Sequence, residues 1–316
     1  MDFAEYWYSR YGRRVRLCSV SVDLDEIGCY SQIHGLTPEI ENHTVYDVAL
    51  ARIRDFAASM DLPLTLFVIA RDLGRRQNED GLLQMVSDGH EIGNHSLDHW
   101  YDLTRREQAE QARQIVAANS LIKERLGVQP LGFRAPGYTV SDALLELVGE
   151  AGLLYDSSVF PSPPYYAAKA AALLRLKLQR RASRSVLDSP AVLRAPSTPY
   201  RVGVPYWTSG NGLLEFPIQV AGPLRLPFIG TSLSLLGPGA ARLMTRGLVG
   251  VQFVNLELHG IDFLDAQDVP KPLAAVQPDL RVPFRRKLET FAAVLQTLRG
   301  QGYTAVSLEE AARVFR

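Results

Sequence analysis

Residues 14–25 read RVRLCSVSVDLD, a valine-rich run of strand-forming residues that ends in two aspartates. Similar apolar runs occur at 63–70 (PLTLFVIA), 251–259 (VQFVNLELH) and 303–306 (YTAV). Segments whose apolar residues recur with helical spacing lie between these runs. Strands that alternate with helices in this way are typical of parallel βα units, so the pattern predicts an α/β fold.

The same reasoning predicts shorter elements elsewhere. Further strands are expected at 90–95, 131–134 and 153–156, and helices at 44–60, 81–88, 104–126, 141–151, 283–299 and 307–315. We expect Thr44 with Asp47, and Thr104 with Glu107, to form capping pairs at two helix starts. Ser307 is expected to cap the last helix.

The chain is longer than one barrel needs. It has 316 residues, whereas a (β/α) barrel typically takes roughly 250. The surplus falls at 161–250, a segment with 11 of the 19 prolines and no evident alternation of strands and helices. We therefore expect a single domain over residues 1–316, with a basic, proline-rich insertion or cap at 161–250.

Charge is distributed unevenly along the chain. The 34 basic and 34 acidic residues cancel overall, which gives no indication of a nucleic-acid partner. Residues 161–250, however, hold 11 lysines and arginines against two acids, and 169–184 (KAAALLRLKLQRRASR) hold six of them. This stretch is interpreted either as a solvated basic helix or as a contact with an anionic membrane or phosphate. The apolar stretch 224–239 is expected to cap the barrel mouth or to form a lipid-facing loop.

The sequence predicts a cytoplasmic protein. Its two cysteines, Cys18 and Cys29, do not form a disulfide framework. The N-terminal residues lack the pattern of a secretory leader, and no uncharged apolar run approaches the length of a membrane span.

Two local patterns carry the chemistry of a metal site. His95 and His99 face the same side if they share one helical turn, and such a pair can clamp a transition metal. Asp23 and Asp25 end the first strand, where two adjacent buried carboxylates need a cation or a proton. Together they offer a three-ligand zinc site with an open position. Each pattern also has an ordinary interpretation, as two surface histidines and as a turn.

Polar residues also follow three other predicted strands. Residues 132–138 read GFRAPGY, in which Arg134 can pair with a carboxylate and the Pro-Gly turn can point an N–H into a cleft. Asp156 follows the strand at 153–156, and His259 ends the strand at 251–259. Taken alone, each of these residues is explained more simply by an ordinary structural role.

Taken in order, the five segments resemble the polysaccharide deacetylase family, also called the NodB-homology family or carbohydrate esterase family 4. The resemblance covers roughly residues 15–160 and 250–315. It implies a distorted (β/α) barrel of about seven parallel strands. It also implies a hydrolase that uses Zn²⁺ or another divalent transition metal to activate water and remove acyl groups from sugars.

The resemblance also implies roles for individual residues. By position, Asp23 matches the catalytic base, His259 the catalytic acid, and Arg134 the residue that orients the base. Asp25, His95 and His99 match the metal ligands. Pro136, Gly137 and Tyr138 match the turn for the oxyanion and substrate, and Asp156 matches an acid that orients Arg134 or binds the sugar.

Three departures from the family pattern stand out. Leu24 separates the two aspartates, and Gly137 separates Pro136 from Tyr138, which leaves open which N–H faces the oxyanion. Glu257 replaces the family's leucine two residues before the catalytic histidine, so a carboxylate lies near the site or on the opposite strand face.

The expected substrate follows from the expected location. A cytoplasmic enzyme of this family would act on an N-acetylated or N-formylated biosynthetic intermediate, either linked to a polyprenyl phosphate or carried on a nucleotide. Such a protein would contact the cytoplasmic face of a membrane through 169–184. Two alternatives stay open: a non-catalytic carbohydrate-binding relative, and a hydrolase of non-sugar amides such as cyclic ureides. His34 and His43 either line the cleft or are ordinary loop residues.

Overall fold

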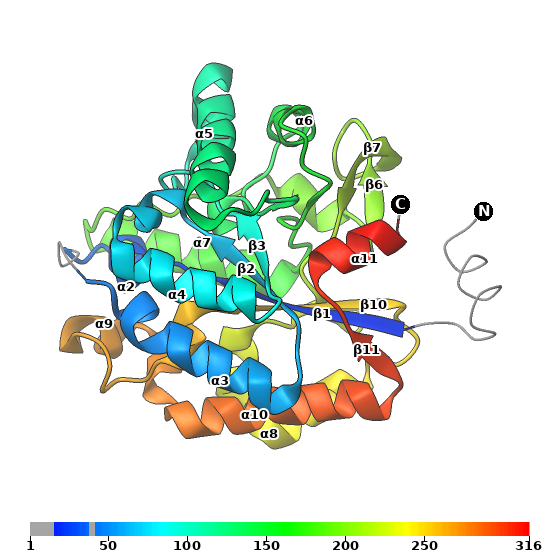
Figure 1. Ribbon diagram of the computed structural model, residues 1–316. Helices are drawn as coiled ribbons and strands as arrows, with labels where there is room; N and C mark the ends of the chain where they lie inside the picture. Colours follow the sequence, from blue (N-terminus) through cyan, green and yellow to red (C-terminus); the bar gives the residue numbers. More distant parts are fainter. Residues whose placement is uncertain (1–15, 38–41, 316) are drawn as a thin grey trace.

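The computed structural model describes residues 16–37 and 42–315 and has an α/β architecture (Figure 1). Its main sheet runs in the order β10-β1-β2-β3-β4-β5-β7-β6. All neighbours on this path are parallel except β6 and β7, so seven strands from β10 to β7 run in one direction. Their bounds are β10 (Phe253–His259), β1 (Arg16–Asp23), β2 (Leu64–Val68), β3 (Glu91–Asn94), β4 (Gly132–Phe133), β5 (Tyr155–Asp156) and β7 (Ser209–Glu215). The distorted barrel predicted from the sequence is confirmed.

The two ends of this parallel sheet, at β10 and just after β7, come together. After β7 the chain runs along β10, where the Gln219 N–H donates to the Asn255 carbonyl oxygen at 3.1 Å. The side chain of Asn255 donates in turn to the carbonyl oxygens of Phe216 and Pro217. An additional strand, β11 (Tyr303–Ala305), pairs with the start of β1. Central strands such as β2 are buried on both faces, as parallel strands covered by helices must be.

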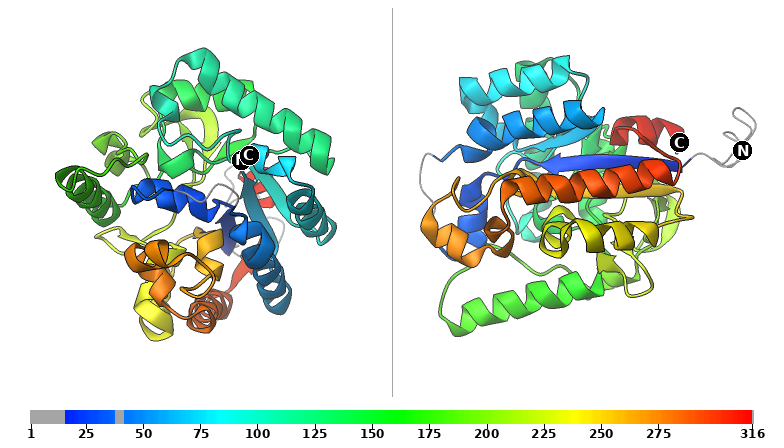
Figure 2. Two further views of the ribbon diagram at one scale, coloured as in Figure 1. Left: turned by 90° about the vertical axis from the view of Figure 1, so that its left-hand side faces the viewer. Right: turned by 90° about the horizontal axis from the view of Figure 1, so that it is seen from below.

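Helices surround the strands on the outside (Figure 2). They are α2 (Ile27–Ile33), α3 (Leu50–Met60), α4 (Arg76–Ser87), α5 (Gln108–Leu126), α6 (Asp142–Glu150), α7 (Pro163–Leu178), α8 (Gly230–Arg246), α9 (Lys271–Val276), α10 (Phe284–Gly300) and α11 (Leu308–Val314). Ser307 forms the predicted cap of α11, and its side chain accepts from the Glu310 N–H. The described helices include none with the length and apolar character needed to cross a membrane.

Two predicted helix caps are wrong. Thr44 makes no cap to Asp47; its hydroxyl donates to Asn42, and the helical segment starts as a π-turn at Val45–Ala49. The carboxylate of Glu26 accepts the first N–H groups of this turn from a distant part of the chain. Thr104 lies in a separate 3₁₀ turn, and α5 begins only at Gln108 without a side-chain cap. Sequence proximity suggested these caps, whereas tertiary contacts decide them.

The segment 161–250 contains more regular structure than its sequence indicates. Its second half supplies β7, the seventh parallel strand, and α8, which packs against α10. The expectation that this segment lacks a strand–helix unit is therefore wrong. The stretch 224–239 is likewise not a loop throughout, because α8 begins at Gly230. The first half behaves differently: α7 has no buried residue and lies at the edge of the body (Figure 2).

Candidate active site

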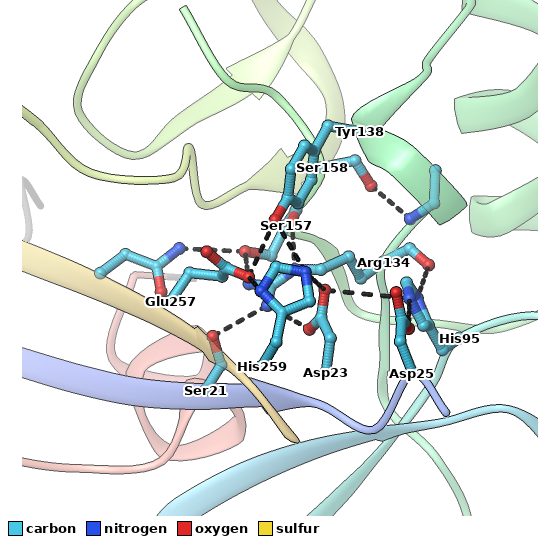
Figure 3. A network of polar contacts seen from close by, with 12 residues as sticks. Ser21, Asp23, Asp25, His95, Arg134, Tyr138, Ser157, Ser158, Glu257 and His259 are labelled. Atoms are coloured by element: carbon cyan, nitrogen blue, oxygen red, sulfur yellow. Dashed lines mark hydrogen bonds and ion pairs between the residues drawn. The ribbon is translucent and has the colours of Figure 1, made fainter. Parts of the chain in front are cut away.

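The carboxyl ends of the parallel strands bring the predicted residues together. Asp23 ends β1 and is paired in register with His259, which ends β10. His95 follows β3 and Arg134 follows β4, so the ends of four strands of one sheet bring these side chains to one point (Figure 3). In barrels of parallel strands this end is where active sites form.

Asp25, His95 and His99 form a compact set of donor atoms. Oδ1 of Asp25 lies 3.1 Å from Nε2 of His95 and 3.2 Å from Nε2 of His99. All three residues are buried, and neither Asp25 Oδ1 nor His99 Nε2 has a hydrogen-bond partner among the described residues. Buried polar atoms without partners are costly unless a ligand satisfies them. One carboxylate and two imidazoles are a donor set that fits a divalent transition metal.

The two histidines differ in their electrostatics: burial alone would lower the pKa of His95, but Asp23 and Asp25 raise it. Burial lowers the pKa of His99 and favours the neutral imidazole, which is the form that binds a cation. Nδ1 of His95 lies 2.7 Å from the backbone carbonyl oxygen of Arg134, so Nδ1 carries a proton and donates it to that oxygen. The lone pair of Nε2 is then the one that can bind a metal. Although burial alone would raise the pKa of Asp25, the two histidines hold it well below its usual range.

The two histidines do not share a helical turn, and this part of the prediction is wrong. Ser96 and His99 both have positive φ angles, 65° and 55°. The side chain of Asn94 accepts the Ser96 N–H at 2.7 Å, and the Ser96 hydroxyl accepts the His99 N–H at 3.0 Å. These bonds fix a tight turn after β3 that brings both rings to the same point by another route.

Asp23 is held by Arg134, as the sequence predicts. Nη1 of Arg134 donates to Oδ1 of Asp23 at 2.6 Å and to the Ser21 hydroxyl at 2.9 Å. The remaining guanidinium donors reach the carbonyl and hydroxyl oxygens of Ser157. Burial raises the pKa of Asp23, and the charge of Arg134 offsets part of that effect. Its free oxygen, Oδ2, lies 3.8 Å from His95 Nε2 and 3.9 Å from His259 Nε2, between the donor set and the candidate acid.

Glu257 faces the site, which resolves one alternative that the sequence leaves open. Its Oε1 lies 2.8 Å from Nδ1 of His259 and accepts the hydroxyl of Tyr138 at 2.9 Å. Strand alternation could have located it, because residues two apart on β10 point the same way. Asp23, Glu257 and His259 form a second cluster of metal-ligating types. However, Asp23 Oδ1 and His259 Nδ1 already have partners, unlike the donor atoms of Asp25 and His99.

The turn at 136–138 identifies the N–H that is available for an oxyanion. The Tyr138 N–H donates to the Ala135 carbonyl oxygen at 3.0 Å, whereas that of Gly137 has no partner within the described ranges. Gly137 has φ 64°, and a Cβ at this position would lie 2.8 Å from the ring of Tyr101. A glycine is therefore required here, and Pro136 is buried at the start of the turn.

Asp156 is not part of this cluster. Its carboxylate accepts the N–H and the hydroxyl of Ser158, and the Ser158 hydroxyl accepts the Ala135 N–H. Asp156 also lies against Glu215, and burial raises the pKa of both carboxyl groups. No hydrogen bond joins Asp156 to Arg134 in the described structure, so it supports the 134–138 turn from below.

A cavity of about 440 Å³ lies over these residues. Asp23, Asp25, His95 and His259 line its floor, and α7 forms one wall with mainly apolar side chains such as Tyr165, Ala168, Leu173 and Leu176. His34 also lines the cavity, whereas His43 does not.

Lys169 contributes the one lysine to the cavity wall. It reaches from α7 to the Gly137 carbonyl oxygen at 2.9 Å, and burial lowers its pKa to about 8. The α7 helix is thereby attached to the turn that carries the free Gly137 N–H.

Comparison with protein families finds a match to one part of the chain. Residues 44–155, which include His95, His99 and Arg134, match the sequence profile of the family described as "Polysaccharide deacetylase". No curated protein sequence matches the chain.

Solved structures extend the similarity to almost the whole chain. A protein from Mycobacterium smegmatis, assigned to the polysaccharide deacetylases, is 16% identical over 94% of this chain and 90% of its own, with a TM-score of 0.55. A family 4 carbohydrate esterase from Streptomyces lividans, in complex with acetate, is 12% identical over 92% and 91%, with a TM-score of 0.45. A family 4 pseudoenzyme from Bacillus anthracis is 13% identical over 94% and 66%, with a TM-score of 0.48. The chain therefore matches the polysaccharide deacetylase family model over residues 44–155, and its fold is similar to that of the Mycobacterium smegmatis protein over almost its whole length.

Proposed function

We propose that this protein is a metal-dependent hydrolase that removes an N-acyl group, acetyl or formyl, from a sugar. The observation that carries the proposal is the compact set of ligand atoms from Asp25, His95 and His99 beside Asp23 and His259. Two of these atoms, Asp25 Oδ1 and His99 Nε2, have no hydrogen-bond partner among the described residues. This arrangement supports a cation site, a base and an acid that lie close to one another. The match of residues 44–155 to the polysaccharide deacetylase family supports sugar deacylation as the general reaction.

The chain's own residues have separate tasks in such a reaction. Asp25, His95 and His99 would hold a divalent cation, which would supply Lewis-acid chemistry for the carbonyl and lower the pKa of water. Asp23, oriented by Arg134, accepts the proton of the attacking water. The free N–H of Gly137 stabilises the negative charge that develops on the carbonyl oxygen.

His259 completes the reaction as the acid. Its position between Asp23 and Tyr138 at the cavity floor suits the transfer of a proton to the leaving nitrogen. Ser158 and Asp156 support the proposal indirectly, because they hold the Ala135 N–H and so the turn that carries Gly137.

The proposed substrate is an intermediate linked to a polyprenyl phosphate or to a nucleotide. Two observations support this class over a long polysaccharide chain: the apolar α7 wall of the cavity and the lysine that reaches into it. The proposal also includes Zn²⁺ as the metal, a cytoplasmic location, contact of 169–184 with an anionic membrane, and a single catalytic domain capped by part of 161–250.

The proposal is tested by incubating the purified protein with N-acetylated and N-formylated sugars and measuring free amine and carboxylate. The panel includes chito-oligosaccharides, UDP-N-acetylglucosamine and polyprenyl-phosphate-linked amide sugars. We expect hydrolysis that a chelator abolishes and added zinc restores. Protein without metal that zinc does not activate would indicate the non-catalytic alternative, and hydrolysis of cyclic ureides alone would indicate the other.

A further inference from the structure

The one lysine that the described residues contribute to the cavity wall, Lys169, lies beside the turn that carries the free Gly137 N–H. Its Nζ donates to the Gly137 carbonyl oxygen at 2.9 Å. A Cβ at Gly137 would lie 3.8 Å from the same nitrogen. The ammonium group is therefore within one residue's length of the N–H that is available for an oxyanion.

The protein does not neutralise this ammonium group. No carboxylate oxygen of the described residues lies within 4.0 Å of Nζ. Burial lowers the pKa of Lys169 to about 8, and the charge of Asp188 offsets only part of that effect. The Asp188 carboxylate accepts the Ser189 N–H at 2.7 Å instead of bonding to the lysine. Lys169 is thus still largely protonated at neutral pH and has no ion-pair partner.

The acids on the cavity floor do not serve as counter-ions either. Asp23 is paired with Arg134 at 2.6 Å, and Oδ1 of Asp25 lies 3.1 Å from Nε2 of His95. Around the ammonium group itself the wall is mainly apolar and aromatic, and the ring centroid of Tyr165, one helical turn earlier, lies 6.0 Å from Nζ. The cavity therefore holds a cation whose charge no neighbouring acid balances.

Most of the hydrogen-bonding capacity of Lys169 is unused. An ammonium group has three N–H donors, and the Gly137 carbonyl oxygen is the acceptor that the described residues provide for them. A desolvated charge with unused donors is costly unless a ligand or water compensates it. The remaining donors are available for an anion that enters the cavity.

The attachment of α7 does not by itself explain a charged residue at this position. The helix is held at its start, where the Ser162 hydroxyl donates to the Arg225 carbonyl oxygen at 2.8 Å. The chain after the helix is held as well, because the Ser183 hydroxyl donates to the Ile33 carbonyl oxygen at 2.7 Å. A neutral donor could make the bond to Gly137 without the cost of desolvating a charge.

We propose that Lys169 is a specificity-determining residue that binds the phosphate of the substrate while the sugar's amide lies at the neighbouring Gly137 N–H. This proposal rests on the proposed function. Lysine binds phosphate as a point charge, and an apolar wall strengthens the contact because little water competes for it. The amide and the phosphate must then lie close together, as they do when both are attached to one sugar ring. An uncharged sugar amide lacks this contact.

Matched sugars with and without phosphate test this role. N-acetylglucosamine 1-phosphate and methyl N-acetylglucosaminide carry the same amide. We expect the wild type to have a kcat/KM about 10- to 100-fold higher on the phosphorylated sugar, the range that a hydrogen bond to a charged group contributes. In Lys169→Met this ratio should fall toward one, mainly through loss on the phosphorylated sugar. Lys169→Arg should regain part of the preference, because it keeps the charge.

A second lysine variant is the control. Lys123 is an exposed lysine on α5 that does not line the cavity, so Lys123→Met should keep the wild-type ratio. An equal fall on both sugars in Lys169→Met would show that the side chain only holds the Gly137 turn. No change on either sugar would show that it does not meet the substrate. Either result would overturn the proposal.

The same ratio identifies the source of the phosphate. UDP-N-acetylglucosamine and a polyprenyl-phosphate-linked amide sugar both carry phosphate next to the sugar. A kcat/KM on either carrier that exceeds that on the methyl glycoside, and that Lys169→Met removes, supports the proposal and shows whether a nucleotide or a lipid supplies the phosphate. A wild type that prefers the uncharged sugar would overturn it.

Binding of the deacylated products gives a readout that needs no turnover. Calorimetric titration with glucosamine 1-phosphate and methyl glucosaminide should show that the wild type binds the phosphorylated product more tightly and that Lys169→Met does not. Equal affinities in the wild type, or no binding of either product, would overturn the role of Lys169. If the wild type hydrolyses no sugar amide, the proposed function fails while the titration still decides whether Lys169 binds phosphate.

Discussion

Nη1 of Arg134 lies 2.6 Å from Oδ1 of Asp23, and the two side chains are 0% and 1% exposed. The guanidinium also lies over the ring of Phe67, with 4.2 Å from Cζ to the ring centroid. A buried ion pair of this kind is costly to break, because the remaining partner keeps an uncompensated charge. Its presence at the end of β1 leaves one oxygen of Asp23 free to act as a base.

Asp23→Asn should separate catalysis from metal binding. Asn keeps the hydrogen bond with Arg134 but cannot accept a proton from water, so kcat should fall by about 10²- to 10⁴-fold. Metal content, measured on the purified variant, should equal that of the wild type because Asp25, His95 and His99 are untouched. A fully active Asp23→Asn variant would contradict the assignment of Asp23 as the base.

His99→Ala should weaken metal binding by more than about 100-fold. Removing only the hydrogen-bond partner of a ligand costs up to about this factor, and removing the ligand itself should cost more. His34→Ala is the matched control, since His34 lines the same cavity but is bonded to Gln277 at 2.7 Å. Competition with a zinc indicator measures both affinities. Equal affinities in the two variants would show that His99 is not a ligand.

The α7 segment should bind anionic vesicles through its exposed leucines and its basic residues. Leu174 and Leu178 are 57% and 77% exposed, and basic side chains near a membrane contribute about 1 kcal/mol each. Leu178→Glu should therefore reduce co-sedimentation with phosphatidylglycerol vesicles. Leu243→Glu, at a 71% exposed leucine on α8, should not. Absence of binding by the wild type, or equal loss in both variants, would rule out this surface.

Glu91 should make stability depend on pH. Burial raises its pKa to about 7 from the model-peptide value of 4.5, so the folded state keeps a proton that the unfolded chain loses between these values. The free energy of unfolding should fall with rising pH in this window, by at most about 1.4 kcal/mol per unit for this group. Urea unfolding at several pH values should show that the free energy of unfolding of Glu91→Gln depends less steeply on pH. The surface variant Glu150→Gln should keep the wild-type dependence. An unchanged slope in Glu91→Gln would contradict the assigned shift.

Much of the barrel could be predicted because its longer strands are continuous apolar runs. The strands β1, β2, β10 and β11 fall within their predicted ranges. The strand β7 was missed because its sequence, SGNGLLE, has glycines and exposed residues in its first half and only two buried residues at its end. Its place in the sheet depends on pairing with β5 and β6, which lie outside the reach of local patterns.

The site was predictable in composition but not in detail. Residue order along the chain pointed to Asp25, His95 and His99, and the structure brings them together. The turn between the histidines depends on the Asn94 side chain and on two positive φ angles, which spacing does not reveal. The contacts of Glu257 could not be predicted from local sequence, because Tyr138 reaches the same oxygen as His259 from a distant turn.

The central claim is that Asp25, His95 and His99 hold a metal that this fold uses to hydrolyse an N-acyl sugar. The most direct measurement is amine release from the substrate panel by the protein as purified, after chelation, and after zinc is added back, with metal content determined for each sample. The account predicts about one metal per chain and activity that falls and returns with it. Activity that is unchanged in metal-free protein would contradict it.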